Sequence, residues 1–360
     1  IEYADRALDL TQPDTRDHAA ARLALGRSHA SLFHHDVAMA ELDAALAASL
    51  ACGWEWGAAE SLNIRGSLAF QYKEASTQDD FERALHLAER AGSAHAIAHA
   101  LQNLGRIRVD ARDFPAAIAL LNRASDLWIQ LGFRSFCGVV QRDLAEIARR
   151  EGRREDAIAS LEKSIALCRE AGAQQDLGLS LYELGSVYYE WGDIAAAERL
   201  YREAYALVDG TDFDPQGNFI GNMIGCCLVR RGDYDEALTW HQKSLERYRA
   251  AGIEDGMVWT LDRIAVALAL NGDIRDSAVL RGAMEAARAS SGQTRAPWDQ
   301  ADLDQAERLA RESLGDAAFD AALAEGASLA LAEAADLASR RTSPTESDGC
   351  LLNPHDPDSK

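Results

Sequence analysis

The chain has 360 residues, of which 48% are hydrophobic and 26% are charged, and its formal net charge is −21. This composition fits a globular protein with a sizeable core, and the acidic balance argues against a surface that binds nucleic acid or an anionic membrane. Six scattered cysteines without metal-site spacing, no signal peptide and no apolar run of membrane-spanning length favour a cytoplasmic location.

The first residues predict the second helix of an incomplete repeat. Arg6-Ala7-Leu8-Asp9-Leu10 matches Arg83-Ala84-Leu85-His86-Leu87, which belongs to the second helix of a later unit. A repeat array needs a polar end cap, and half a repeat is a poor one. We therefore expect residues 1–18 to be the second helix of a truncated repeat, and the chain to be part of a larger protein.

Residues 19–292 carry an internal repeat with a period of 39 or 40 residues. A small residue marks the first helix of each unit, where it would let a neighbouring helix approach closely. A second small residue recurs near the end of each unit, which predicts two helices per unit. The first marker recurs seven times, at Gly26, Gly66, Gly105, Ala145, Gly185, Gly225 and Ala265.

The turn inside each unit is expected seven residues after the marker, as at Gly192-Asp193, Gly232-Asp233 and Gly272-Asp273. Glycine can adopt the left-handed conformation that ends a helix, and aspartate can cap the next helix. The spacing of Asp233 and Glu236 also predicts a capping box.

One unit resembles the tetratricopeptide repeat (TPR) in its Leu184-Gly185, Tyr188, Ala197, Tyr201 and Ala204. Leu181 and Asp209 replace the tryptophan and proline of that signature, and the period is 40 rather than the usual 34. The resemblance implies an all-α fold, a right-handed superhelical solenoid of about seven TPR-like helix pairs with a C-terminal helical cap.

Residues 293–339 are expected to form that cap, and residues 340–360 a disordered tail. The cap resembles the terminal block of bacterial STAND-type regulators, including LuxR/MalT-like and SARP-type multidomain ATPases. The resemblance implies signal transduction or transcription regulation, with ATPase and output domains elsewhere in the same polypeptide. It rests on Leu314-Gly315, Ala318-Phe319, Ala322, Glu325-Gly326 and Glu333-Ala334.

Catalytic and metal motifs are missing from the sequence. It has no phosphate-binding Gly-x-x-x-x-Gly-Lys loop, no Gly-x-Ser-x-Gly elbow and no His-Glu-x-x-His helix. His95 and His99 could share a helix face, but a zinc site needs a third ligand. We therefore expect a non-enzymatic domain without a metal or cofactor.

The inner surface of the solenoid is the candidate binding site, because the first helix of each unit lines it in the TPR family. Aromatic, arginine and amide side chains suit a peptide, protein or small effector. Arg142, Arg149 and Arg150 predict a local basic spot for an anionic ligand or acidic peptide. The candidates are Asn63, Gln102, Arg106, Arg142, Glu146, Arg149, Tyr182, Tyr189, Phe219, Asn222, Trp259 and Asp262.

The sequence is compatible with two main functional interpretations. The first is a protein- or effector-binding sensor arm of a larger bacterial regulator, which the terminal block and the half-repeat favour. The second is a stand-alone scaffold or peptide-binding adaptor of the co-chaperone kind. An enzyme built on a solenoid is a third possibility, for which no motif speaks.

Overall fold

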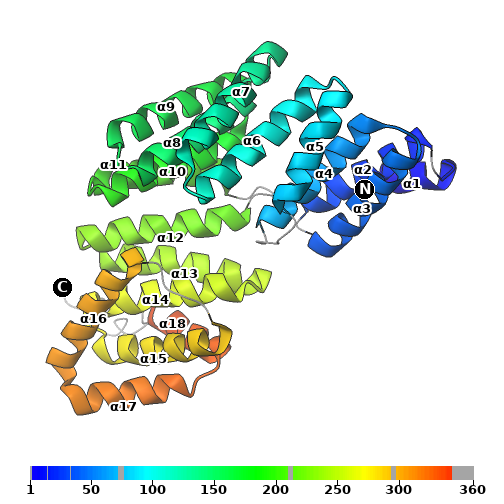
Figure 1. Ribbon diagram of the computed structural model, residues 1–360. Coiled ribbons are helices and arrows are strands. Elements are labelled where there is room, and N and C mark those ends of the chain that lie inside the picture. Colours follow the sequence, from blue (N-terminus) through cyan, green and yellow to red (C-terminus); the bar gives the residue numbers. More distant parts are fainter. Residues whose placement is uncertain are drawn as a thin grey trace, which may run out of the picture. The chain divides into compact units, whose positions relative to one another are not determined.

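The computed structural model describes residues 2–13, 15–32, 34–71, 77–209, 214–292 and 297–342. Within these ranges it contains eighteen α-helices and no β-strand (Figure 1). The chain divides into two compact units, Ile1–Val187 and Tyr188–Lys360, which we describe separately. The all-α fold of successive helix pairs expected from the sequence is confirmed.

The helices are mostly 14 to 18 residues long. The first unit holds α1 (Glu2–Leu10), α2 (Arg16–Ser31), α3 (His35–Ala51), α4 (Glu55–Gln71), α5 (Thr77–Arg90), α6 (Ala94–Asp110), α7 (Phe114–Leu131), α8 (Arg134–Arg150), α9 (Arg154–Ala171) and most of α10 (Gln174–Glu190). The second holds α11 (Ile194–Val208), α12 (Asp214–Arg231), α13 (Tyr234–Ala251), α14 (Glu254–Asn271), α15 (Ile274–Ser291), α16 (Pro297–Leu314), α17 (Asp316–Ala327) and α18 (Leu331–Thr342).

Left-handed residues end the helices at the predicted turns. Gly132, for example, has φ 77° after α7, and the next residue, Phe133, donates its N–H to the Trp128 carbonyl at 3.0 Å. This is the hydrogen bond of a Schellman C-cap. Arg112 occupies the same kind of position with φ 58°, and is the one non-glycine residue with positive φ among those described.

Aspartate caps the following helix in some turns only. Asp113 and Asp193 accept hydrogen bonds from the N–H groups of Ala116 and Ala196, at 3.3 and 3.1 Å. Asp233 makes no such bond, and its carboxylate pairs with Arg231 at 3.0 Å instead. The capping box predicted at Asp233 is therefore wrong, because a neighbouring arginine holds the capping carboxylate.

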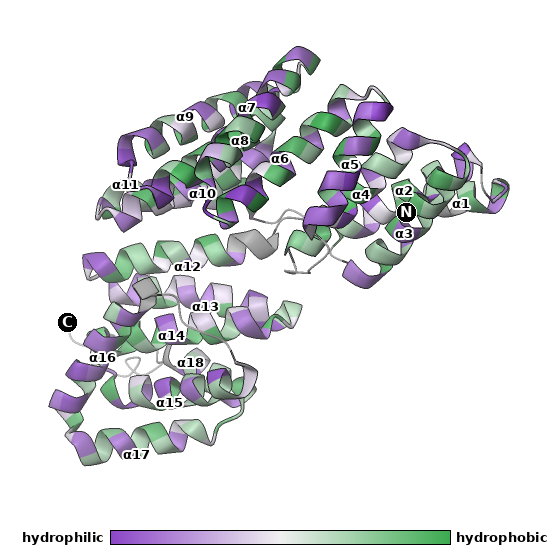
Figure 2. Cartoon of the chain, viewed as in Figure 1, coloured by the Kyte–Doolittle hydropathy of each residue, from purple (hydrophilic) through white to green (hydrophobic). Residues whose placement is uncertain are grey.

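The marker residues allow the two helices of a pair to pack closely. A Cβ added at Gly105 of α6 would lie 2.8 Å from Leu121 Cγ of α7, and one at Gly26 would lie 2.7 Å from Leu42 Cγ. On α7, Ala117, Leu121 and Ala124 are all fully buried. Most helices of both units accordingly carry hydrophobic and hydrophilic residues together, as amphipathic helices do (Figure 2).

Helices α16 to α18 follow the last pair, and α17 crosses α15 at two glycines. A side chain on Gly282 would collide with the Leu323 carbonyl oxygen, and one on Gly326 with the Val279 carbonyl oxygen. Phe319 is fully buried in the same contact. The two backbones thus touch, and the cap is held by close packing of small residues.

The predicted domain boundaries stay predictions. α1 ends at Leu10 and α18 continues to Thr342, whereas residues 293–296 and 343–360 lie outside the described residues. The stretch Gln71–Asp80, which lacks the Gly-Asp turn of other repeats, includes residues 72–76, which are also outside them; α5 begins at Thr77.

Candidate functional site

A pocket of about 320 Å³ lies on the first helices of successive pairs in the first unit. It brings together five of the predicted residues, Arg106, Arg142, Glu146, Arg149 and Tyr182. They come from α6, α8 and α10, where they stand three residues before, one after or four after the marker. The other lining residues are Phe70, Val109, Asp110, Asp143, Ala145, Arg150, Leu161, Glu183, Ser186 and Val187.

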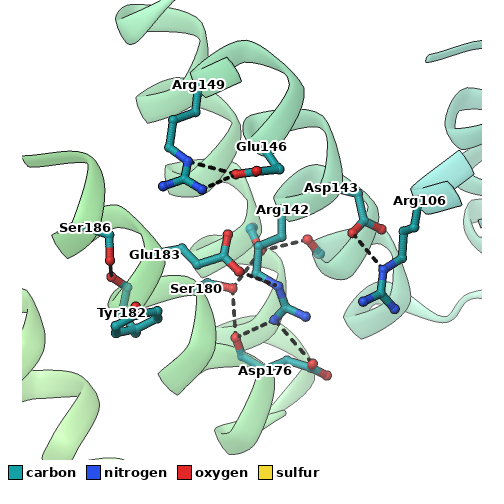
Figure 3. A network of polar contacts seen from close by, with 12 residues as sticks. Arg106, Arg142, Asp143, Glu146, Arg149, Asp176, Ser180, Tyr182, Glu183 and Ser186 are labelled. Carbon is teal, nitrogen blue, oxygen red and sulfur yellow. Dashed lines mark hydrogen bonds and ion pairs between the residues drawn. The ribbon is translucent and has the colours of Figure 1, made fainter. Parts of the chain in front are cut away.

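Arg142 lies in the middle of the polar contacts that line this pocket, with only 13% of its side chain exposed. Its guanidinium faces the carboxylates of Asp176 at 3.5 Å and Glu183 at 3.7 Å (Figure 3). It also donates a long hydrogen bond to the Asp176 carbonyl at 3.4 Å. These distances exceed those of charge-assisted hydrogen bonds, so the ion pairs of Arg142 are loose.

Glu146 holds the two arginines that follow it on α8. Arg149 donates to Glu146 Oε2 at 2.6 and 2.8 Å, and Arg150 donates to Glu146 Oε1 at 2.6 Å. Arg150 also reaches Asp110 at 3.0 Å and the Val109 carbonyl at 3.0 Å. Both guanidinium groups are thus engaged at hydrogen-bond distance.

Arg106 of α6 is more exposed and less engaged. Its guanidinium lies 3.7 Å from Asp143 and 5.0 Å from the centre of the Phe70 ring, and 44% of its side chain is exposed. Asp143 is in turn oriented by Gln102, which donates to it at 3.0 Å and accepts from the indole N–H of the buried Trp128 at 3.3 Å.

The pocket has mixed charge rather than a basic surplus. Four arginines line it together with four carboxylates, those of Asp110, Asp143, Glu146 and Glu183. The basic spot predicted from Arg142, Arg149 and Arg150 is therefore corrected. The helix spacing does bring the arginines together, but acidic residues on α6, α8 and α10 neutralise them.

Burial raises two pKa values in the pocket. Burial on the pocket wall, reinforced by Asp143 and Glu146 and opposed by Arg142, raises the pKa of Glu183 to about 7. Burial likewise raises the pKa of Asp143, against the opposing charge of Arg106. Glu183 is thus able to take up a proton close to neutral pH.

Four of the predicted residues are buried, so the expectation that they lie exposed on the inner surface is wrong. Asn63 donates to the Ala96 carbonyl at 3.2 Å, and Gln102 bridges Asp143 and Trp128 as described above. Asn222 joins the ring of His241 at 2.8 Å to Thr260 at 2.7 Å, and Asp262 pairs with Arg288. Each of these side chains makes a hydrogen bond or an ion pair with a group on a neighbouring helix, because buried polar atoms need such partners.

The remaining predicted residues lie in the second unit and are aromatic. Phe219 and Trp259 stack on each other with ring centres 4.7 Å apart and planes 15° apart. This contact joins α12 to α14, so it is part of the packing between repeats. Tyr189 lies beneath the Arg230 guanidinium, 5.7 Å from the ring centre, and burial raises its pKa.

Of the four pocket carboxylates, the sequence-based prediction included Glu146 but missed Asp110, Asp143 and Glu183. Asp143 and Glu183 immediately follow Arg142 and Tyr182, two positions before the marker of their repeats. In a chain with 58 acidic residues they carry no distinguishing motif. The repeat register gives the signal that could have found them, because it places both positions on the same side of the first helices.

Comparison with known proteins identifies the repeats in part of the chain. Residues 137–209 and residues 222–251 match models of the tetratricopeptide repeat family. The chain contains tetratricopeptide repeats. The first match includes α8, which carries much of the pocket, and the second includes α13. No curated protein matches the sequence significantly.

Several solved structures share the fold at low sequence identity. The crystal structure of NprR in complex with its cognate peptide NprX is 17% identical, with a TM-score of 0.52 over 88% of this chain and 94% of that one. Aspartyl phosphate phosphatase F from Bacillus subtilis is 12% identical, with a TM-score of 0.52 over 87% and 83%. A Rap protein complexed with competence and sporulation factor is 13% identical, with a TM-score of 0.50 over 91% and 98%.

Among the described residues, no helix combines the length and apolarity needed to cross a membrane. His95 Nδ1 lies 3.2 Å from Glu60 Oε1, and within the described ranges no three His, Cys, Asp or Glu side chains are grouped so as to hold a metal ion.

Proposed function

We propose that the first unit is a non-catalytic binding domain that holds a peptide carrying an acidic group in the pocket of α6, α8 and α10. The observation that carries the proposal is the loose pairing of Arg106 and Arg142, whose nearest carboxylates lie 3.5 to 3.7 Å away. A ligand carboxylate at 2.7–2.9 Å would make stronger bonds than either existing pair. Each such bond is worth about 1.5–3 kcal/mol.

The remaining lining suits an extended chain. Phe70 and Tyr182 offer aromatic surface beside the two arginines, and Ser186 and the carboxylates offer polar contacts. Large aromatic side chains next to arginines are typical of residues that dominate peptide binding. The cognate peptide bound by NprR, in a structure of the same fold, supports this choice of ligand class.

An array of heptapeptides that differ only by Glu, Gln or Lys at one position tests the proposal on the full chain. We expect the Glu peptides to be retained more strongly than their Gln counterparts. Arg106→Gln and Arg142→Gln should each weaken that retention roughly tenfold, which is about 1.4 kcal/mol. Equal retention of Glu and Gln peptides by the unchanged chain would contradict the proposed ligand class.

Arg149→Gln is the matched control. Arg149 lines the same pocket, but its guanidinium donates to Glu146 at 2.6 and 2.8 Å. Its loss should change retention about twofold or less, since its guanidinium already has a strong partner. If Arg149→Gln weakens binding as much as Arg106→Gln, the distinction between loose and engaged arginines fails.

We infer further that the chain serves as the sensor arm of a larger bacterial signalling or transcriptional regulator in the cytoplasm. Support comes from the resemblance of the cap, residues 293–339, to the terminal block of STAND-type regulators. The six cysteines of the sequence have no disulfide-framework spacing, which favours a reducing compartment. Reading the coding sequence upstream of Ile1 tests this context: a frame that continues into an ATPase module supports it, and a start codon within one repeat's length contradicts it.

A further inference from the structure

The inner surface of the second unit differs from the pocket of the first unit, because a helix of the chain itself covers it. Val266 and Ala269 of α14 pack against Leu303 and Ala306 of α16, with Val229 of α12 at the edge. Both α14 residues stand one and four positions after the marker Ala265, where α8 carries Glu146 and Arg149. The two positions that are charged on α8 are therefore apolar on α14, where α16 lies on them.

Charge complementarity fixes the orientation of α16 on this groove. Asp302 faces two arginines of the groove, Arg230 of α12 at 3.3 Å and Arg263 of α14 at 3.5 Å. One turn further along, Glu307 pairs with Arg281 of α15 at 2.6 Å. Arg281 also donates to the Leu303 carbonyl at 2.9 Å.

The contact of α16 with the groove is narrow. Of its side chains that the structure describes, only Leu303, Ala306 and Ala310 are buried, whereas α14 buries twelve residues. The Arg263 side chain lies beneath Asp302 and is only 3% exposed. Because a buried guanidinium is costly without a counter-charge, any helix that covers this groove needs an acidic residue at the position of Asp302. The groove thus combines an apolar surface with flanking arginines, which suits the binding of an acidic amphipathic helix.

We propose that this groove is a binding site for an acidic amphipathic helix, and that α16 occupies it as a strap which a partner helix displaces. The partner would carry an acidic residue next to a leucine, with a small residue and a second acid one turn later, as Asp302, Leu303, Ala306 and Glu307 do. A groove that reads one helical face in this way is a known mode of peptide recognition. The proposal is independent of the pocket in the first unit.

The test uses the full chain and a fluorescein-labelled peptide of residues 297–314, with binding followed by fluorescence anisotropy. Asp302→Lys places a like charge against Arg230 and Arg263, so it should loosen α16 and let the peptide bind in its place. The variant should bind the peptide roughly tenfold more tightly than the unchanged chain, because a groove occupied in cis is rarely available. Glu312→Lys, the same charge change at an exposed position of α16, should leave binding at the level of the unchanged chain.

Two results would overturn the proposal. One is equal binding by Asp302→Lys and the unchanged chain; the other is equal binding of a peptide that carries Leu303→Asp. Should Asp302→Lys unfold the second unit, hydrogen exchange of the unchanged chain decides instead. A displaceable α16 exchanges its amides at least about tenfold faster than α14 does, and exchange of the two helices at one common rate would make α16 part of the core.

Discussion

Glu183 should make the stability of the first unit depend on pH in a way that a single substitution can isolate. Its pKa lies at about 7 in the folded chain, against an ordinary value of 4.5, because burial and the neighbouring carboxylates disfavour its charge. As the pH rises, Glu183 therefore loses its proton at a lower pH in the unfolded chain than in the folded chain. Stabilisation from the neutral carboxyl is complete below about pH 4.5 and is lost as the pH rises through about 7.

The size of the effect follows from the two pKa values. A difference from 4.5 to about 7 corresponds to about 3 kcal/mol, at about 1.4 kcal/mol per pKa unit. The Glu183 side chain is 38% exposed, however, and solvent screening reduces the figure to about 1–2 kcal/mol. Glu183→Gln should thus stabilise the chain more at about pH 8 than at about pH 5.5, by roughly 1 kcal/mol.

Urea unfolding of the unchanged chain and of the Glu183→Gln variant at the two pH values, followed by circular dichroism, measures this difference in the free energy of unfolding. The lower pH stays above the pI of about 4.8, where the chain would lose its net charge. Hydrogen exchange of α8 amides assigns the change to the first unit. Glu162→Gln, at an exposed position of α9, is the control and should show no such difference. An equal effect of Glu183→Gln at both pH values would refute the argument that the pocket wall disfavours this charge.

Three further substitutions test the packing. Arg112→Gly should raise the free energy of unfolding by about 1 kcal/mol, because glycine adopts φ 58° without strain; a loss of stability in urea unfolding would contradict this. Gly105→Ala should lower it by about 1–3 kcal/mol through the contact with Leu121, and an unchanged melting curve would show that the two helices can separate at little cost. Gly326→Ala meets the Val279 backbone, which cannot move aside as a side chain can, so limited proteolysis should release α17 and α18 faster than in the unchanged chain.

Much of the fold could be predicted from the sequence because the residues that helix packing and helix termination require recur at fixed intervals. Gly105 and Gly26 are small because Leu121 and Leu42 lie against them, and Gly132 and its counterparts have positive φ. These constraints are local to one helix pair, so a single repeat reveals them. The side-chain cap at Asp233 failed for an equally local reason, since Arg231 lies two residues away.

The candidate site was predictable only in part. Helix periodicity correctly brings Arg106, Arg142 and Arg149 to one pocket. It does not predict that Asn222 makes a buried hydrogen bond with His241, because a buried amide and an exposed amide can stand at the same position of the repeat. Nor does it reveal Glu183, whose importance comes from other acids in the folded state and from no motif of its own.

The register of the repeats also explains why one inner surface is open and another is covered. One and four residues after the marker, α8 carries Glu146 and Arg149, whose charges pair with each other in the open pocket. At the same positions α14 carries Val266 and Ala269, which would expose apolar surface unless a helix lay on them. Burial of that surface favours a covering helix, and the flanking arginines select an acidic one. Polarity at these two positions therefore distinguishes the open surface of α8 from the covered surface of α14.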